Sequence, residues 1–174
     1  MIIVVMGVSG AGKTTVGQLL ASQSGWEFAD ADDFHSVANI EKMRSEVPLT
    51  DAERAPWLAT LRGLIAGWIA ARKNAVLACS ALKRAYRETL NIGSLNTGSL
   101  NTGSEVRFVY LKGTPQLLRQ RLHLRVGHFM TERMLDSQLM TLEEPDNAIV
   151  VDIDKSPEEI VAEIRTKLGL AKKL

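Results

Sequence analysis

The sequence has almost no net charge, a single cysteine and no long apolar run. Its 174 residues carry a formal net charge of +1, so no overall field favours nucleic acid or an anionic membrane as a partner. The lone Cys79 cannot form an internal disulfide, which fits a reducing compartment. No apolar stretch could span a bilayer, and Met1 leads into apolar residues without the basic segment of a signal peptide. We therefore expect a cytoplasmic protein with a small-molecule partner, and with neither nucleic acid nor a membrane as partner.

Short apolar runs alternate with amphipathic segments along the chain. The runs lie at residues 2–6, 26–29, 75–79, 106–111 and 148–153. They lack period-two alternation, which is typical of strands buried on both faces of a parallel sheet. Helical spacing separates them, with helix starts expected near Lys13, Pro56, Thr114 and Ser156. We predict a single doubly wound α/β domain over residues 1–174, with ligands at the carboxyl ends of the strands.

The most specific motif, G-x-x-x-x-G-K-T, follows the first apolar run. Its glycines let successive backbone N–H groups point inward, and the helix that starts near Lys13 adds the positive end of its dipole. Lys13 can reach the β- and γ-phosphates of ATP, and the Thr14 hydroxyl can ligate Mg²⁺. A chance Gly-rich turn is the alternative, but a strand before the motif and a helix after it favour a phosphate site. The expected nucleotide-binding residues are Gly7, Val8, Ser9, Gly10, Ala11, Gly12, Lys13, Thr14 and Thr15.

The phosphate motif does not identify what receives the phosphoryl group. A GTPase should carry an N-K-x-D motif, and a transporter ATPase should carry an L-S-G-G-Q-like stretch. The sequence contains neither. These two absences, together with the small size of the chain, favour a small-molecule kinase.

Three carboxylates, those of Asp30, Asp32 and Asp33, follow the second candidate strand. Beside a triphosphate they would repel the nucleotide unless a metal ion or a substrate hydroxyl engages them. Phosphoryl transfer needs one acid to hold Mg²⁺ or its waters and another to orient and deprotonate the attacking alcohol. The alternative is an acidic, solvated loop, which the neighbouring phosphate motif makes the weaker interpretation.

Two groups of basic residues follow. Arg54, Lys83 and Arg87 would suit an anionic acceptor, since Arg can clamp a carboxylate through two hydrogen bonds; the alternative is unrelated surface cations. The second group lies between two helical patterns and is predicted to form a lid at about residues 121–135 that excludes water and adds positive charge; the alternative is a turn that connects two helices and exposes its charges. Its residues are Arg121, Arg125, Gly127 and His128.

One segment has no capacity to bury surface. Residues 93–104 read GSLNTGSLNTGS, a tandem repeat of small and polar residues. Such a composition favours solvated coil, so we predict a flexible surface loop remote from the chemistry.

Together the motifs resemble the gluconate kinases (gluconokinases), a family of P-loop small-molecule kinases. The resemblance covers nearly the whole chain outside residues 93–104. It rests on GVSGAGKTT from Gly7, D-x-D-x-x-H at Asp30, Asp32 and His35, NIEKM from Asn39, PLTDAERAPWL from Pro48, CSALKRAYR from Cys79, GHFM from Gly127, SQLMTLEEP from Ser137 and VVDID from Val150.

The resemblance implies ATP-dependent phosphorylation of the 6-hydroxyl of D-gluconate. It also implies a three-layer αβα fold with a parallel sheet in the order 2-3-1-4-5, a mobile lid and, in many members, a homodimer. The implied catalytic residues are Lys13, Asp32 and Arg125, and Arg121 and Arg125 also bind the nucleotide. The implied substrate-binding residues are Asp32, His35, Arg54, Lys83, Arg87 and His128, with Thr14 and Asp30 on the magnesium side.

Two alternatives stay open, and three departures from the family are visible: residues 93–104 are an insertion, the segment between Pro145 and Ala148 is shorter than usual, and the third lies at Glu46. The acceptor could be another hydroxy acid such as shikimate, or the chain could be a regulator that binds ATP without transferring phosphate. Asp33 is a less certain candidate than Asp32. Glu46 stands where family members usually have Gly, so the turn before Pro48 is expected to differ in conformation.

Overall fold

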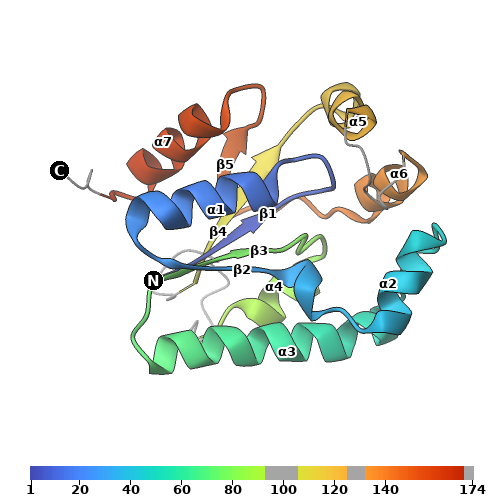
Figure 1. Ribbon diagram of the computed structural model, residues 1–174, viewed down its shortest axis with the longest axis horizontal. Helices are drawn as coiled ribbons and strands as arrows, with labels where there is room; N and C mark the ends of the chain where they lie inside the picture. The colour runs from blue at the N-terminus through green and yellow to red at the C-terminus, as the bar shows by residue number, and fades with distance from the viewer. Residues whose placement is uncertain (93–105, 125–131, 171–174) are drawn as a thin grey trace.

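The computed structural model describes residues 1–92, 106–124 and 132–170, and it contains a sheet of five parallel strands (Figure 1). The strands are β1 (Ile2–Met6), β2 (Glu27–Asp30), β3 (Ala75–Ala78), β4 (Val106–Lys112) and β5 (Ile149–Asp152). Their order across the sheet is β2-β3-β1-β4-β5, which confirms the predicted architecture. Each apolar run of the sequence forms a strand whose ends lie within one residue of the expected ones.

Helices form the two outer layers (Figure 1). One face of the sheet is covered by α1 (Lys13–Ser24) and α7 (Pro157–Lys167). The same core continues to α5 (Pro115–His123) and α6 (Glu132–Thr141), which lie beyond the carboxyl ends of the strands. The other face is covered by α3 (Asp51–Ala70) and α4 (Arg84–Leu90). The short 3₁₀ helix η1 (Ala31–Phe34) and α2 (Val37–Arg44) connect β2 to α3. The loops that follow the strands therefore meet at one edge of the sheet.

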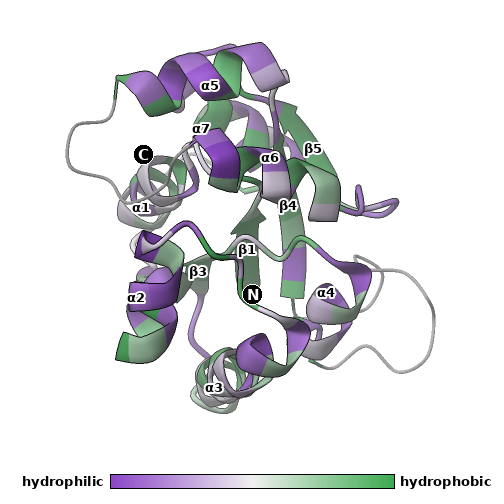
Figure 2. Ribbon diagram, turned by 90° about the vertical axis from the view of Figure 1, so that its right-hand side faces the viewer, coloured by the Kyte–Doolittle hydropathy of each residue, from purple (hydrophilic) through white to green (hydrophobic). Residues whose placement is uncertain are grey.

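The central strand explains why the apolar runs are continuous. All five residues of β1 are fully buried. Ile3 and Val5 belong to the core under α1 and α7, whereas Ile2 and Val4 belong to the core under α3. Since successive side chains of a strand point to opposite faces, a strand covered on both faces needs apolar residues at every position. Figure 2 shows the same property as predominantly apolar colour along the strands.

The helix ends follow local capping rules, with one correction to the prediction. In α7 the Ser156 hydroxyl accepts from the Glu159 amide and the Glu159 carboxylate accepts from the Ser156 amide, so the predicted capping box is confirmed. The expectation that α3 begins at Pro56 is wrong. It begins at Asp51, because Thr50 and Glu53 form a second capping box and Pro56 lies inside the helix.

Of the helices in the described ranges, none combines the length and the apolar character needed to cross a membrane. The predicted loop at residues 93–104 lies outside the described residues, and so do Arg125, Gly127 and His128 of the predicted lid.

The turn before Pro48 keeps a left-handed backbone without glycine. Glu46 has φ of +60°, and its amide donates to the Met43 carbonyl at 3.0 Å while the Val47 amide donates to the Lys42 carbonyl at 3.1 Å. This pair of hydrogen bonds is a Schellman motif that ends α2, and its left-handed position usually carries Gly. Glu46 therefore has a Cβ in a backbone conformation that strains it.

We predict that Glu46→Gly stabilises the protein. The free energy of unfolding should rise by about 0.5–1 kcal/mol, because relief of the left-handed strain outweighs the extra freedom of the unfolded chain. Chemical denaturation measures the change. The matched control is Glu41→Gly in the body of α2, which should lower the free energy of unfolding by about 1 kcal/mol. A loss of stability with Glu46→Gly would show that the Glu46 side chain contributes more than its backbone strain costs.

Candidate active site

The loop between β1 and α1 has the geometry of a phosphate site. Gly7 and Gly10 have φ of +145° and +84°, and a Cβ on Gly10 would lie 3.0 Å from the Leu118 carbonyl oxygen of α5. The loop thus needs glycine both for its backbone angles and for its contact with the neighbouring helix. At the N-cap of α1, Gly12 offers no side chain to the first-turn amides, which leaves the positive end of the helix to an anion.

The two side chains expected at the phosphates lie at the start of α1. Lys13 Nζ donates to the Val8 carbonyl at 3.1 Å, so the lysine folds back over the loop. The Thr14 hydroxyl donates to Asp30 Oδ2 at 2.6 Å, and Asp30 Oδ1 accepts from the Asp32 amide at 3.1 Å. The structure therefore brings together the hydroxyl and the carboxylate that the sequence assigned to magnesium.

This pair of oxygen donors fits Mg²⁺, which prefers hydroxyl, carboxylate, water and phosphate oxygens. Among the described residues, no group of three or more His, Cys, Asp or Glu side chains is placed to hold a metal ion. A metal at Thr14 and Asp30 therefore needs phosphate oxygens and water for most of its coordination sphere, as is usual for Mg²⁺ bound with a nucleotide.

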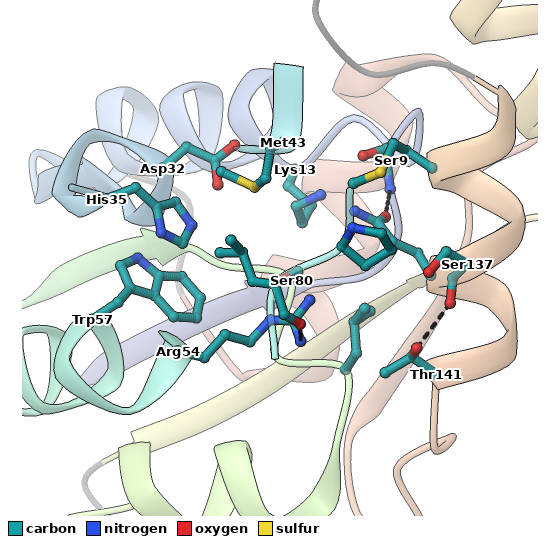
Figure 3. Close-up of a pocket in the computed structure, with 15 residues that line it drawn as sticks. Ser9, Lys13, Asp32, His35, Met43, Arg54, Trp57, Ser80, Ser137 and Thr141 are labelled. Carbon is teal, nitrogen blue, oxygen red and sulfur yellow. Dashed lines mark hydrogen bonds between the residues drawn. The ribbon is translucent and has the colours of Figure 1, made fainter. Parts of the chain in front are cut away.

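A pocket opens beside the phosphate loop, between η1, α3 and α6 (Figure 3). In Figure 3, His35 and Trp57 lie on one side, Ser137 and Thr141 lie on the other, and Arg54 reaches between them. Its lining consists of Ser9, Lys13, Asp32, His35, Met43, Pro48, Leu49, Arg54, Trp57, Ser80, Leu82, Met134, Ser137, Gln138 and Thr141. The acceptor pocket, as we call this set, joins the expected phosphate lysine to the expected base and to one expected anion-binding arginine.

A stacked aromatic pair forms one wall of the acceptor pocket. The rings of His35 and Trp57 lie 4.5 Å apart at 11°, and Trp57 Nε1 donates to the Ala31 carbonyl at 2.7 Å. His35 Nδ1 is buried without a hydrogen-bond partner among the described residues. Burial is the main cause that lowers the pKa of His35, and Arg54 adds to it while Asp32 opposes it. The imidazole that stacks on Trp57 is therefore neutral near pH 7.

The three cations expected at the substrate lie in three different settings. Arg54 lines the acceptor pocket. Lys83 Nζ is paired with Asp51 at 2.8 Å and does not line the pocket. Arg87 is 1% exposed and lies behind the pocket wall, where Nη1 donates to the carbonyls of Ala81 and Leu82 at 3.0 and 2.9 Å. Only Arg54 is thus brought to the pocket surface.

Helix α6 supplies a wall that we did not derive from the residues. Gln138 Oε1 accepts from the Ser9 amide at 2.7 Å, so α6 is joined to the phosphate loop. Just after α6, the Glu143 amide donates to the carbonyl of Leu82, another lining residue of the pocket, at 2.9 Å. The spacing of Ser137 and Thr141, four residues apart on one helix face, is the signal that could have pointed to this wall.

A second, more open pocket lies on the other side of the phosphate loop. Arg121 lines it, and its guanidinium donates to the Ile153 carbonyl at 2.6 Å. The remaining lining residues come from the phosphate loop, α1, α5 and the start of α7; they are Gly10, Gly12, Thr15, Val16, Leu124, Lys155, Pro157 and Ile160. The phosphate loop thus separates two pockets, one toward the acids and one toward Arg121.

The neutral state of His35 is a testable property. Burial holds the pKa of the His35 imidazole below its ordinary 6.5, so the unfolded chain binds the proton more readily than the folded one. The contribution of neutral His35 to the free energy of unfolding is therefore present above pH 6.5 and is lost as the pH falls. NMR titration should place the His35 pKa below 6.5, with His35→Gln identifying the signal among the three histidines. A His35 signal that titrates above 6.5 contradicts the buried environment.

The fold and the site define the class of protein. A parallel sheet in this order, a G-x-x-x-x-G-K-T loop after the central strand and a pocket beside the loop that contains the carboxylate of Asp32 are the features of a P-loop kinase.

Comparison with known proteins narrows the class to one family. A family model described as an AAA domain matches residues 2–145. A probable gluconokinase of Xenopus tropicalis is 48% identical over 94% of this chain and 91% of its own length. The gluconokinase of Gluconobacter oxydans is 44% identical over 93% of this chain and 88% of its own length. The crystal structure of a gluconokinase from Sinorhizobium meliloti superposes with a TM-score of 0.80 at 40% identity, covering 96% of this chain and 90% of that one. The chain belongs to the gluconokinase family, which confirms the resemblance.

Proposed function

We propose that this protein catalyses the ATP-dependent phosphorylation of D-gluconate on its 6-hydroxyl, giving 6-phospho-D-gluconate and ADP. Membership of the gluconokinase family supports the reaction and the substrate. The observation that carries the proposal is the acceptor pocket, in which Lys13, Asp32 and Arg54 line one space. That space holds a phosphate-binding cation, a carboxylate able to act as a base, and a second cation able to bind the carboxylate of a sugar acid.

The phosphate loop and the pocket at Arg121 form the proposed ATP site. A P-loop kinase uses its loop amides and lysine for the phosphates, so Lys13 exchanges the Val8 carbonyl for phosphate oxygens when ATP binds. The second pocket adjoins the loop at Gly10, Gly12 and Thr15, and we assign it to the base and sugar of the nucleotide. Arg121, and Arg125 from the predicted lid, complete the proposed nucleotide contacts.

Thr14 and Asp30 are the proposed magnesium side of the site. The Thr14 hydroxyl oxygen and an Asp30 carboxylate oxygen are in hydrogen-bond contact. Both are therefore close enough to bind one Mg²⁺ ion, either directly or through its water ligands. When bound, Mg²⁺ neutralises charge on the β- and γ-phosphates. The carboxylate of Asp30 also accepts a hydrogen bond from the Asp32 amide, which fixes the proposed metal ligand and the proposed base relative to each other.

Asp32 is the proposed base. The 6-hydroxyl oxygen forms a bond to the γ-phosphorus while the bond from that phosphorus to the β–γ bridging oxygen breaks. ADP departs, and the hydroxyl proton passes to Asp32. Lys13 stabilises the charge on the transferring group, and the predicted lid over residues 121–135, with Arg125 and His128, excludes water that would compete with the sugar.

In the acceptor pocket we place the substrate carboxylate on Arg54. His35, which lines the same pocket, is assigned to a hydroxyl of the sugar chain. Lys83 and Arg87 support the pocket wall from behind, since both are engaged by other protein groups. A single domain over the whole chain, a cytoplasmic location and a homodimer stay predictions.

We predict ADP release that depends on D-gluconate, together with a large loss in Asp32→Asn. In an assay with ATP·Mg²⁺, release should exceed that with shikimate, glucose or no acceptor. Asp32→Asn should lower kcat by about 10²- to 10⁴-fold, the usual contribution of a general base. The matched control is Asp33→Asn, which removes an exposed neighbouring carboxylate outside the acceptor pocket.

The outcomes separate the assignments. Equal losses in the two variants would mean that the charge of the loop matters and that neither acid is the base. A loss in Asp33→Asn alone would move the base to Asp33. Release with shikimate in place of gluconate would keep the kinase and reject the substrate, and no acceptor-dependent release would favour a regulator that only binds ATP.

The magnesium assignment predicts a selective effect of Thr14. Thr14→Val keeps the shape of the side chain and removes the hydroxyl, whereas Thr14→Ser keeps the hydroxyl. Thr14→Val should raise the Mg²⁺ concentration for half-maximal activity by about tenfold, the range seen when a single metal ligand or its support is removed. Thr14→Ser should stay close to the wild-type value. An unchanged magnesium requirement in Thr14→Val would remove Thr14 from the site.

A further inference from the structure

Four polar side chains from α3 and the start of α4 meet behind the acceptor pocket. Lys83 Nζ lies 2.8 Å from each carboxylate oxygen of Asp51, and the Tyr86 hydroxyl donates to Asp51 Oδ1. Arg54 Nη1 lies 3.4 Å from the Tyr86 oxygen, and its guanidinium carbon lies 5.8 Å from the centre of the Tyr86 ring. Arg54 is the only one of the four that lines the pocket.

The hydrogen bonds in this group have a fixed direction. A tyrosine hydroxyl has one proton, and Tyr86 donates it to Asp51. Burial is the main cause that raises the pKa of Tyr86, with Asp51 adding to it, while Lys83 and Tyr86 lower the pKa of Asp51. The hydroxyl therefore keeps its proton, its oxygen can only accept, and the group that donates to it is Arg54.

The same contacts determine which donors of Arg54 remain for a ligand. Nη1 donates to both the Leu49 carbonyl and Tyr86. Within the described residues no hydrogen bond engages Nε or Nη2 of Arg54, and none of the ion pairs includes Arg54. Lys83 neutralises the nearby Asp51. Arg54 thus keeps its positive charge and two adjacent donors, which is the arrangement that binds a carboxylate through two hydrogen bonds.

We propose that Tyr86 and Asp51 are positioning residues that make the enzyme selective for acceptors carrying a carboxylate. They act through Arg54, whose guanidinium they hold in one orientation at the pocket surface, and Lys83 keeps Asp51 from pairing with Arg54 instead. The inference rests on the proposed function, because it assigns the acid group of the acceptor to Arg54. It also explains why Lys83 lies near the pocket without lining it.

The experiment compares D-gluconate with D-glucitol, an uncharged acceptor with the same chain of hydroxyl groups. Tyr86→Phe removes only the hydroxyl. It should raise the KM for gluconate about tenfold, the effect of one hydrogen bond to a charged group, and leave kcat and the KM for ATP within about twofold. The value of kcat/KM for glucitol should not change, so the preference for the acid falls about tenfold. In an Arg54→Met background, Tyr86→Phe should have no further effect.

Two further variants guard against a general loss of structure. Tyr110→Phe removes the hydroxyl of the other tyrosine, which lies on β4, contacts Glu144 and does not line the pocket. It should leave the preference for the acid unchanged. Asp51→Ala removes an exposed side chain at the start of α3 and should reproduce the selective loss even if Tyr86→Phe folds poorly.

The possible failures can be told apart. Equal losses for gluconate and glucitol, or no loss for either, overturn the positioning role while the kinase reaction stands. A loss that persists in the Arg54→Met background shows that Tyr86 does not act through Arg54 and also overturns it. If the unmodified protein neither phosphorylates gluconate nor binds it in calorimetry, both the proposed function and this inference fail.

Discussion

The pairing of β1 with β3 on one side and β4 on the other is the interaction on which the site depends. Val5 is in register with Ala78 of β3 and with Val109 of β4, so β1 and β3 end within one residue of each other while β4 continues to Lys112. The Gly7 amide then donates to the Ser80 carbonyl at 3.4 Å, which joins the phosphate loop to the acceptor pocket. A slip of β1 by one residue would exchange its side chains between the two cores and separate these loops.

The sequence predicted the features that depend on neighbours in the chain. The phosphate loop, the acids at the end of β2 and the capping box of Ser156 each form within a few residues of the chain. In each of them the residue types in that spacing are typical of one structural or chemical role. The start of α3 was missed although Thr50 and Glu53 carry a capping signal, because Pro56 offered a competing one. The resemblance to a family added the acceptor, which no local pattern specifies.

Contacts between distant segments could not be predicted in the same way. Arg54, Lys83 and Arg87 are all basic residues, and the sequence does not distinguish their settings. Arg54 lines a pocket, Lys83 is paired with an acid, and Arg87 is buried against carbonyl groups. The setting of each basic side chain depends on where Asp51, Tyr86 and the strand ends lie after folding. Likewise, the hydrogen bond between Gln138 and Ser9 joins residues 129 positions apart. Burial and partners, rather than charge, decide what a cation does.

The two attachments of α6 have a consequence for how the protein can change. Gln138 holds the helix to the phosphate loop, and two residues past the helix end the Glu143 amide donates to the Leu82 carbonyl, which Arg87 also binds. A helix fixed at both of these points cannot be altered as an independent part. Substitutions on α6 that adapt the pocket to a new acceptor will therefore combine non-additively with changes in the phosphate loop. New specificity on this scaffold is more accessible through the wall formed by His35 and Trp57, whose ring stacking and hydrogen bond, among the described residues, do not involve that loop.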